Sequence, residues 1–176
     1  MMGKTAKTPL RRLNVMNAHG FARTLGHVFE NSPWVAERAF HLHPFASIAD
    51  LHEKLCRTLA AASDEEKLAL IRAHPDLVGK MAQAGQLTPH SAAEQAAAGL
   101  DKLSREEVES FQAYNDVYRE TFGFPFVICA RENTKEAILA AFPRRLKHTR
   151  EREIDVAIDE ICKIAHLRVL DAVSEE

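Results

Sequence analysis

The fold is decided at residues 72–80, which read Arg72-Ala73-His74-Pro75-Asp76-Leu77-Val78-Gly79-Lys80. A segment with helical apolar periodicity runs into this stretch, and Pro75 then removes a backbone donor and ends the helix. Because a residue before proline is pushed toward an extended backbone, His74 is predicted to lie on a stiff corner at a helix C-terminus. Imidazole titrates nearest neutrality among the side chains, so His74 is a candidate proton donor or acceptor. A purely structural role at the helix end is the alternative.

The rest of the chain is predicted to form helices around this corner. Alternating strand patterns are nearly absent, and alanine, leucine, glutamate and lysine, which favour helix, are frequent. Seven glycines and seven prolines are scattered, and no repeat or linker divides the 176 residues. We therefore expect an all-α fold, a single compact multi-helix domain of roughly eight helices over residues 13–176. A disordered basic tail, residues 1–12, is expected to precede it.

Local signals place several helix ends. Ser47 is predicted to begin a helix that runs to about Ala61, and capping boxes at 63–66 and 104–107 begin two more. Residues 124–128, Phe-Pro-Phe-Val-Ile, cannot form a helix interior and suit a buried extended segment. A following helix is predicted to be interrupted near Pro143.

Composition excludes several classes of function. A net charge of −2 gives no long-range attraction for nucleic acid or anionic lipid. Three cysteines without a C-x-x-C pattern read as reduced thiols of an intracellular protein. No apolar run reaches the roughly 18 residues of a membrane span, and Met1–Arg12 lacks the apolar region of a secretory signal. We expect a cytoplasmic protein without nucleic-acid or membrane partners.

Arg168 interrupts an apolar pattern. Ile154, Ile158, Ile161 and Ala165 share one face of the last predicted helix, and the next position on that stripe is Arg168. A cation in this position must find an anion, or its side chain must extend out of the helix end into solvent. Both interpretations remain open from the sequence.

Glu94 has a similar ambiguity. In the stretch Ser91-Ala92-Ala93-Glu94-Gln95 it stands three residues after a serine, so a capping box headed by Ser91 explains it without any chemistry. A glutamate held at a helix start also suits a carboxylate that contacts a ligand.

Other polar patterns are weaker. His41-x-His43 resembles half of a metal site, but no third ligand stands at a sensible spacing, so we expect no metal. Cys129 follows an apolar run and is expected to pack rather than to act as a nucleophile. Asn115 shares part of the inward aromatic face of the helix after Ser104, which suggests a buried hydrogen-bonding residue.

Taken together, these stretches resemble the 2-oxo-4-hydroxy-4-carboxy-5-ureidoimidazoline (OHCU) decarboxylases, which complete the oxidation of urate to allantoin. The resemblance extends from about Asn14 to Val169. Four pieces carry it in order: 25–35 (LGHVFENSPWV), 73–77 (AHPDL) with 91–95 (SAAEQ), 122–128 (FGFPFVI), and 160–168 (EICKIAHLR).

The resemblance implies a helical homodimer that uses no metal or organic cofactor. It implies that the small-molecule substrate is OHCU and that the products are (S)-allantoin and CO2. The catalytic residues of the family fall on His74, Glu94 and Arg168. Its substrate-binding residues fall on Pro75, Ser91, Ala92, Ala93 and Gln95, and on the backbone of Phe126, Val127, Ile128, Cys129 and Ala130.

Two other functions remain open from the sequence. A hydrolase of a related cyclic ureide would use the same three polar residues but would need to activate water. A helical interaction module without enzymatic activity would instead present an exposed apolar helix face.

Overall fold

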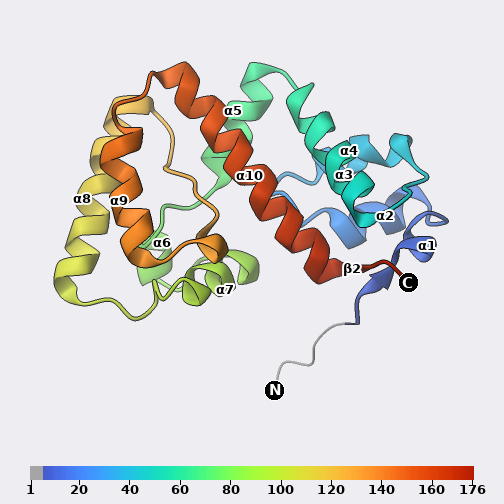
Figure 1. Cartoon of the computed structure of the whole chain (residues 1–176), viewed down its shortest axis with the longest axis horizontal. Helices are drawn as coiled ribbons and strands as arrows, with labels where there is room; N and C mark the ends of the chain where they lie inside the picture. Colours follow the sequence, from blue (N-terminus) through green and yellow to red (C-terminus); the bar gives the residue numbers. More distant parts are fainter. Residues whose placement is uncertain (1–5) are drawn as a thin grey trace. The chain divides into compact units, whose positions relative to one another are not determined.

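The structure is a computed structural model that describes residues 6–176, the side chain of Met81 excepted. Helices dominate this part of the chain, which confirms the predicted all-α fold (Figure 1). Within it the one sheet is a parallel pairing of two residues from each end, β1 (Thr8–Pro9) with β2 (Val173–Ser174).

Contacts divide the chain into two compact units. The terminal unit comprises the chain up to Leu70 together with Cys162–Glu176, and the central unit is Ile71–Ile161. Two helices contribute residues to both units, α5 (Asp64–Ala73) and α10 (Arg150–Ala172). The extent of one domain over 13–176 stays a prediction.

The helices that lie wholly in one unit are as follows. The terminal unit holds α1 (Leu10–Leu13), α2 (Ala18–Leu25), α3 (Trp34–Ala39), the 3-10 helix η1 (Phe40–Leu42) and α4 (Ile48–Ala60). The central unit holds α6 (Lys80–Gln83), α7 (Pro89–Ala97), α8 (Arg105–Phe122), the 3-10 helix η2 (Ala130–Glu132) and α9 (Lys135–Arg145).

The predicted disordered tail is folded over its second half. Thr8 pairs with Val173 in the short sheet, and α1 buries Leu10 and Leu13. The prediction of disorder is therefore wrong for residues 8–12, because two leucines three positions apart supply a helical apolar face. Residues 1–5 lie outside the described residues.

The predicted helix starts at Ser47, Ser63 and Ser104 are confirmed. The Ser47 hydroxyl accepts a hydrogen bond from the Asp50 backbone N–H at 3.0 Å. Ser63 and Glu66 exchange side-chain to backbone hydrogen bonds at 3.0 and 3.2 Å, which is a capping box at the start of α5. A second capping box at Ser104 begins α8.

Phenylalanines organise the core of the terminal unit. The ring of Phe21 on α2 lies 5.6 Å from that of Phe40 and 5.7 Å from that of Phe45. The helix α3 packs against both α2 and α4, and α4 buries Leu51 and Leu55 on the same face. Spacings of three and four residues place these apolar side chains on one helix face.

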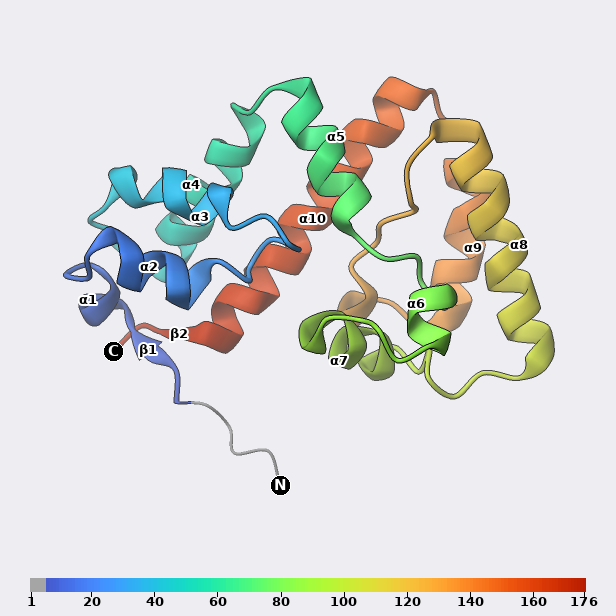
Figure 2. The ribbon, with the colours of Figure 1, turned by 180° about the vertical axis from the view of Figure 1, so that it is seen from behind.

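An aromatic cluster organises the core of the central unit. In Figures 1 and 2, α8 and α9 lie side by side, and the two helices pack together. The members of the cluster are buried: Phe111, Tyr118, Phe122, Phe124, Phe126 and Phe142. Gly123 ends α8 at a φ of 79°, a left-handed conformation that glycine adopts readily.

The segment 124–128 after Gly123 is non-helical and buried, as predicted, whereas α9 continues through Pro143. The predicted interruption at Pro143 is therefore wrong. The ring of Phe142 stacks on Phe126 at 3.9 Å and on Tyr114 at 5.1 Å, and this packing offsets the lost backbone hydrogen bond.

Candidate active site

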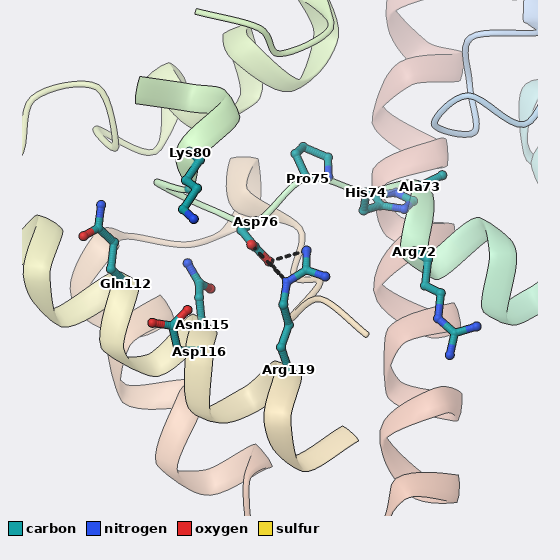
Figure 3. A pocket seen from close by; sticks show the side chains of 11 residues that line it. Arg72, Ala73, His74, Pro75, Asp76, Lys80, Gln112, Asn115, Asp116 and Arg119 are labelled. Atoms are coloured by element: carbon teal, nitrogen blue, oxygen red, sulfur yellow. Dashed lines mark hydrogen bonds and ion pairs between the residues drawn. The ribbon is translucent and has the colours of Figure 1, made fainter. Parts of the chain in front are cut away.

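His74 lies where the sequence predicts, directly after the last residue of α5. Its backbone N–H donates to the carbonyl of Ile71 at 3.1 Å, and its side chain is buried at 6% exposure. His74 and Pro75 line one side of a pocket of about 480 Å³, together with residues of α8. In Figure 3, His74 lies on the far side of Pro75 from the paired side chains of Asp76 and Arg119.

Hydrogen bonds from α7 and α8 fix the loop that follows His74. The side chain of Asn115 donates to the Leu77 carbonyl at 2.7 Å, and Gln95 accepts from the Val78 backbone N–H at 3.1 Å. The prediction of a buried hydrogen-bonding role for Asn115 is confirmed. Val78 itself has a φ of 55°, which is strained for a β-branched residue. These bonds hold the strained backbone, and with it the corner at His74, in one conformation.

Glu94 lies within α7 and not at its start. The helix begins at Pro89, and the hydroxyl of Thr88 caps it by accepting from the Ser91 backbone N–H at 3.3 Å. The capping box headed by Ser91 is therefore wrong, because Thr88-Pro89 supplies an earlier cap and a pre-formed first turn. Glu94 has no part in beginning the helix, so helix capping does not explain the glutamate at this position.

The other predicted binding positions on α7 divide by exposure. Ser91 and Gln95 are buried, Glu94 is half-buried, and Ala92 and Ala93 are exposed. The buried side chain of Gln95 is occupied by the Val78 N–H. In this structure Gln95 therefore connects α7 to the loop after His74.

The segment Phe126–Ala130, whose last residue begins η2, is buried throughout and is held by charged side chains. Arg145 donates to the Val127 carbonyl at 2.6 Å, and Glu160 accepts from the Cys129 backbone N–H at 2.9 Å. Burial, together with the nearby Glu132 carboxylate, raises the pKa of the Cys129 thiol to about 11. A thiol this weakly acidic is a poor nucleophile at neutral pH, as the sequence predicted.

The central unit therefore gathers most of the predicted site. The loop after His74 is bonded to α7 through Gln95, and α7 packs against η2, which begins at Ala130, the last residue of the segment 126–130. The carboxylate of Glu94 is close enough to Cys129 to contribute to the raised pKa of that thiol. His74, the residues of α7 and the segment 126–130 thus belong to one compact unit.

Arg168 belongs to the terminal unit, where it is 2% exposed. Its guanidinium donates to the Glu30 carboxylate at 2.8 Å and to the His27 carbonyl at 3.1 Å. The alternative in which Arg168 extends into solvent is therefore wrong. Its buried anionic partner, Glu30, was not predicted, because the two residues are 138 positions apart.

A second buried arginine, also not predicted, lies in the central unit. Arg145 pairs with Glu153 at 2.8 Å, and Glu153 accepts further hydrogen bonds from Tyr118 and from His148. Burial alone would raise the pKa of Glu153, but the hydrogen bonds from Arg145 and Tyr118 hold it below its ordinary value of 4.5. Ile138, Phe142 and Arg145 stand at helical spacing. An arginine in line with apolar residues on one helix face is the same sequence signal that singled out Arg168.

This pKa shift predicts an acid-sensitive contribution to stability. The pKa of Glu153 is lower in the folded than in the unfolded protein, so its contribution is complete above 4.5 and is lost as pH falls through the folded-state value. The variant Tyr118→Phe/Arg145→Met/Glu153→Leu lacks this carboxylate. We expect the urea midpoint of the wild type to fall more steeply below about pH 4.5 than the urea midpoint of this variant. Parallel declines of the two midpoints would contradict this prediction.

Among residues 6–176, no group of three or more His, Cys, Asp and Glu side chains is arranged to hold a metal ion. His41 and His43 are exposed, and His43 contacts the Phe40 carbonyl through Nδ1 at 2.6 Å. Within the same residues, no helix combines the length and apolar character that crossing a bilayer requires.

Comparison with known proteins identifies the family. A family model described as OHCU decarboxylase matches residues 14–170. The chain belongs to the OHCU decarboxylase family. The OHCU decarboxylase of Haloferax volcanii is 42% identical over 167 residues, which cover 95% of this chain and 97% of that protein. The OHCU decarboxylase of Xenopus laevis is 36% identical, with 95% of each chain covered.

Solved structures of similar proteins agree with this membership. A crystal structure of (S)-allantoin synthase superimposes with a TM-score of 0.73 at 29% identity, covering 94% of this chain and 54% of that one. A crystal structure of OHCU decarboxylase in the presence of (S)-allantoin gives a TM-score of 0.65 over 81% of this chain and 92% of that one. At 23% identity, this second likeness supports the fold alone.

Proposed function

We propose that this protein decarboxylates OHCU to (S)-allantoin and CO2 in urate catabolism, without a metal or an organic cofactor. The observation that carries the proposal is the 42% identity to an OHCU decarboxylase over 97% of that relative's length. The buried histidine beside a pocket in the central unit is consistent with this chemistry.

The proposed mechanism uses the substrate itself as the electron sink. When the bond between the ring carbon and the carboxylate breaks, the electron pair passes into the conjugated C=N of the ring and CO2 leaves. The carbon that lost CO2 is then an enol carbon; its hydroxyl becomes the ring carbonyl as a proton is added to the neighbouring ring carbon, which bears the ureido group, and His74 is the proposed donor of that proton. Delivery from one side only would make the allantoin a single enantiomer.

The other proposed residues bind and orient the substrate. Glu94 accepts hydrogen bonds from ring or ureido N–H groups, and the planar guanidinium of Arg168 binds the oxygen-rich anionic part. Ser91, Pro75 and the backbone of 126–130 contact the remaining amide-like edges. Held in this way, the substrate places its ureido-bearing ring carbon next to the proton donor.

We further propose that the protein is a cytoplasmic homodimer, as the family resemblance implies. Within the part of the chain that the structure describes, the half-buried Cys56 and Cys162 and the buried Cys129 form no disulfide, which suits a reducing compartment. Light scattering on the purified protein measures the molar mass in solution, and a monomeric mass would contradict the dimer.

Glu94→Gln provides a test of the carboxylate. The change keeps the shape of the side chain and removes its charge, so we expect kcat/KM to fall about tenfold or more while the unfolding midpoint hardly moves. The control is Glu106→Gln, an exposed glutamate on α8, for which both quantities should be unchanged. A lowered midpoint with normal turnover per folded molecule would assign Glu94 a structural role.

The function itself is tested on freshly generated substrate. OHCU is unstable, so the upstream enzymes produce it in situ and its decay is followed by ultraviolet absorbance with and without this protein. We expect faster decay, release of CO2 and optically active allantoin. A ring-opened product that retains the carboxyl group would instead support the function of a ureide hydrolase. If the protein has no effect on the decay, the function of an interaction module without enzymatic activity would be supported.

A further inference from the structure

The segment 126–130 is fixed by an unusual contact, a buried arginine on a backbone carbonyl. The guanidinium of Arg145 donates from Nη1 to the Val127 carbonyl at 2.6 Å and from Nε to Glu153 at 2.9 Å. Its carbon Cζ lies 4.2 Å from the centre of the Phe126 ring, and its side chain is only 5% exposed. Two of these contacts, from one rigid planar group, thus fall on neighbouring residues of the segment, and the third ties that group to Glu153.

Further contacts hold the far end of the segment. Cys129 donates its N–H to Glu160 at 2.9 Å, and its carbonyl accepts from the Asn133 side chain at 2.9 Å. Between these fixed points, the backbone N–H groups of Val127 and Ile128 and the carbonyl of Ile128 make no hydrogen bond with any described residue. Buried backbone groups are rarely left unpaired, so these groups require water or a ligand.

A contribution to stability does not by itself explain the buried ion pair. Moving two charges out of water costs several kcal/mol per ion in general, and buried pairs can often be replaced by apolar residues without loss of stability. What an apolar pair cannot do is donate to the Val127 carbonyl. The guanidinium therefore constrains the geometry of the segment.

We propose that Arg145 is a positioning residue for substrate binding. Held by Glu153 and Tyr118, it fixes the Val127 carbonyl so that the unpaired backbone groups of Val127 and Ile128 are pre-organised for the donor and acceptor edge of a ureide. The inference rests on the proposed function, because it assumes that the segment contacts the substrate. The inference adds Arg145, which contacts the segment 126–130 and acts on the substrate through that segment.

The test replaces the whole network with apolar side chains of similar size. In Tyr118→Phe/Arg145→Met/Glu153→Leu both charges of the Arg145–Glu153 pair are removed together, so neither is left buried without its partner, and we expect the unfolding midpoint at neutral pH to stay close to that of the wild type. We expect KM for OHCU to rise about tenfold, with kcat changed much less, because the lost interaction positions bound substrate. The backbone N–H groups of Val127 and Ile128 should also exchange with solvent faster.

The control is Arg144→Met, which removes the exposed neighbouring arginine of the same helix. If wild type and this control fail to decarboxylate OHCU, the proposed function fails. If both turn over and the network variant keeps the wild-type KM, the positioning inference is overturned. If the network variant does not fold, Arg145→Lys is the deciding variant, because one ammonium group cannot bond to both Glu153 and the Val127 carbonyl. A raised KM of Arg145→Lys for OHCU would support the inference, and an unchanged KM would overturn it.

Discussion

We expect the His74→Asn variant to lose decarboxylase activity by about 10²–10⁴-fold in kcat, the range typical for removing a general acid. Asparagine keeps a polar side chain of similar size at a buried site but cannot deliver a proton near neutral pH. The corner is held by Pro75 and by the bonds of Gln95 and Asn115, which the substitution leaves in place. The measurement is single-turnover decay of OHCU, with circular dichroism as the check on folding.

The matched control is His19→Asn, a change to an exposed histidine on α2. It should leave both rate and spectrum unchanged. Near-normal turnover of His74→Asn at an intact helical spectrum would refute the assignment of His74 as the proton donor and leave it a structural residue at the end of α5.

Arg168→Met has the second large expected effect, and it acts on stability as well as activity. The substitution leaves the Glu30 carboxylate buried without its guanidinium partner, which costs about 3–5 kcal/mol in comparable cases. We also expect kcat/KM per folded molecule to fall about 10²-fold or more, because the cation that we propose binds the anionic substrate is lost. Urea titration and steady-state kinetics on the folded fraction measure the two effects separately.

The double variant Arg168→Met/Glu30→Leu separates these effects. Replacing both members of the buried pair removes the unpaired charge, so most of the lost stability should return. Activity should not return, since the cation is still absent. Recovery of turnover along with stability would make Arg168 a structural residue, and the proposed mechanism would then need another anion-binding group.

Features encoded by neighbouring residues were predictable from the sequence. The corner at His74 needs only the steric effect of Pro75, and the helix starts at Ser47, Ser63 and Ser104 need only a side chain that bonds to a backbone N–H three residues away. The apolar stripe that ends in Arg168 singled out this cation, because helical periodicity is a local property, but it left open whether the side chain meets an anion or extends into solvent.

Features that depend on distant contacts were not predictable. Thr88 and Ser91 are both good caps, and spacing alone does not choose between them. The partner of Arg168 is Glu30, and no periodicity links two residues so far apart. Arg145 was overlooked for a related reason: Pro143 locally predicts the end of a helix, but the stacking of Phe142 on Phe126 keeps the helix intact and so aligns the arginine with the buried face.

The left-handed backbone at Val78 has a consequence for engineering. A residue that adopts this conformation easily, such as glycine, would relieve roughly 1–3 kcal/mol of strain and partly compensate for the lost valine side chain. Such a substitution therefore does not raise the stability of the fold, and the freed backbone would also let the imidazole of His74 move from its fixed position. The strain at this one bend is thus better kept, because the fixed backbone it belongs to supports the proposed role of His74.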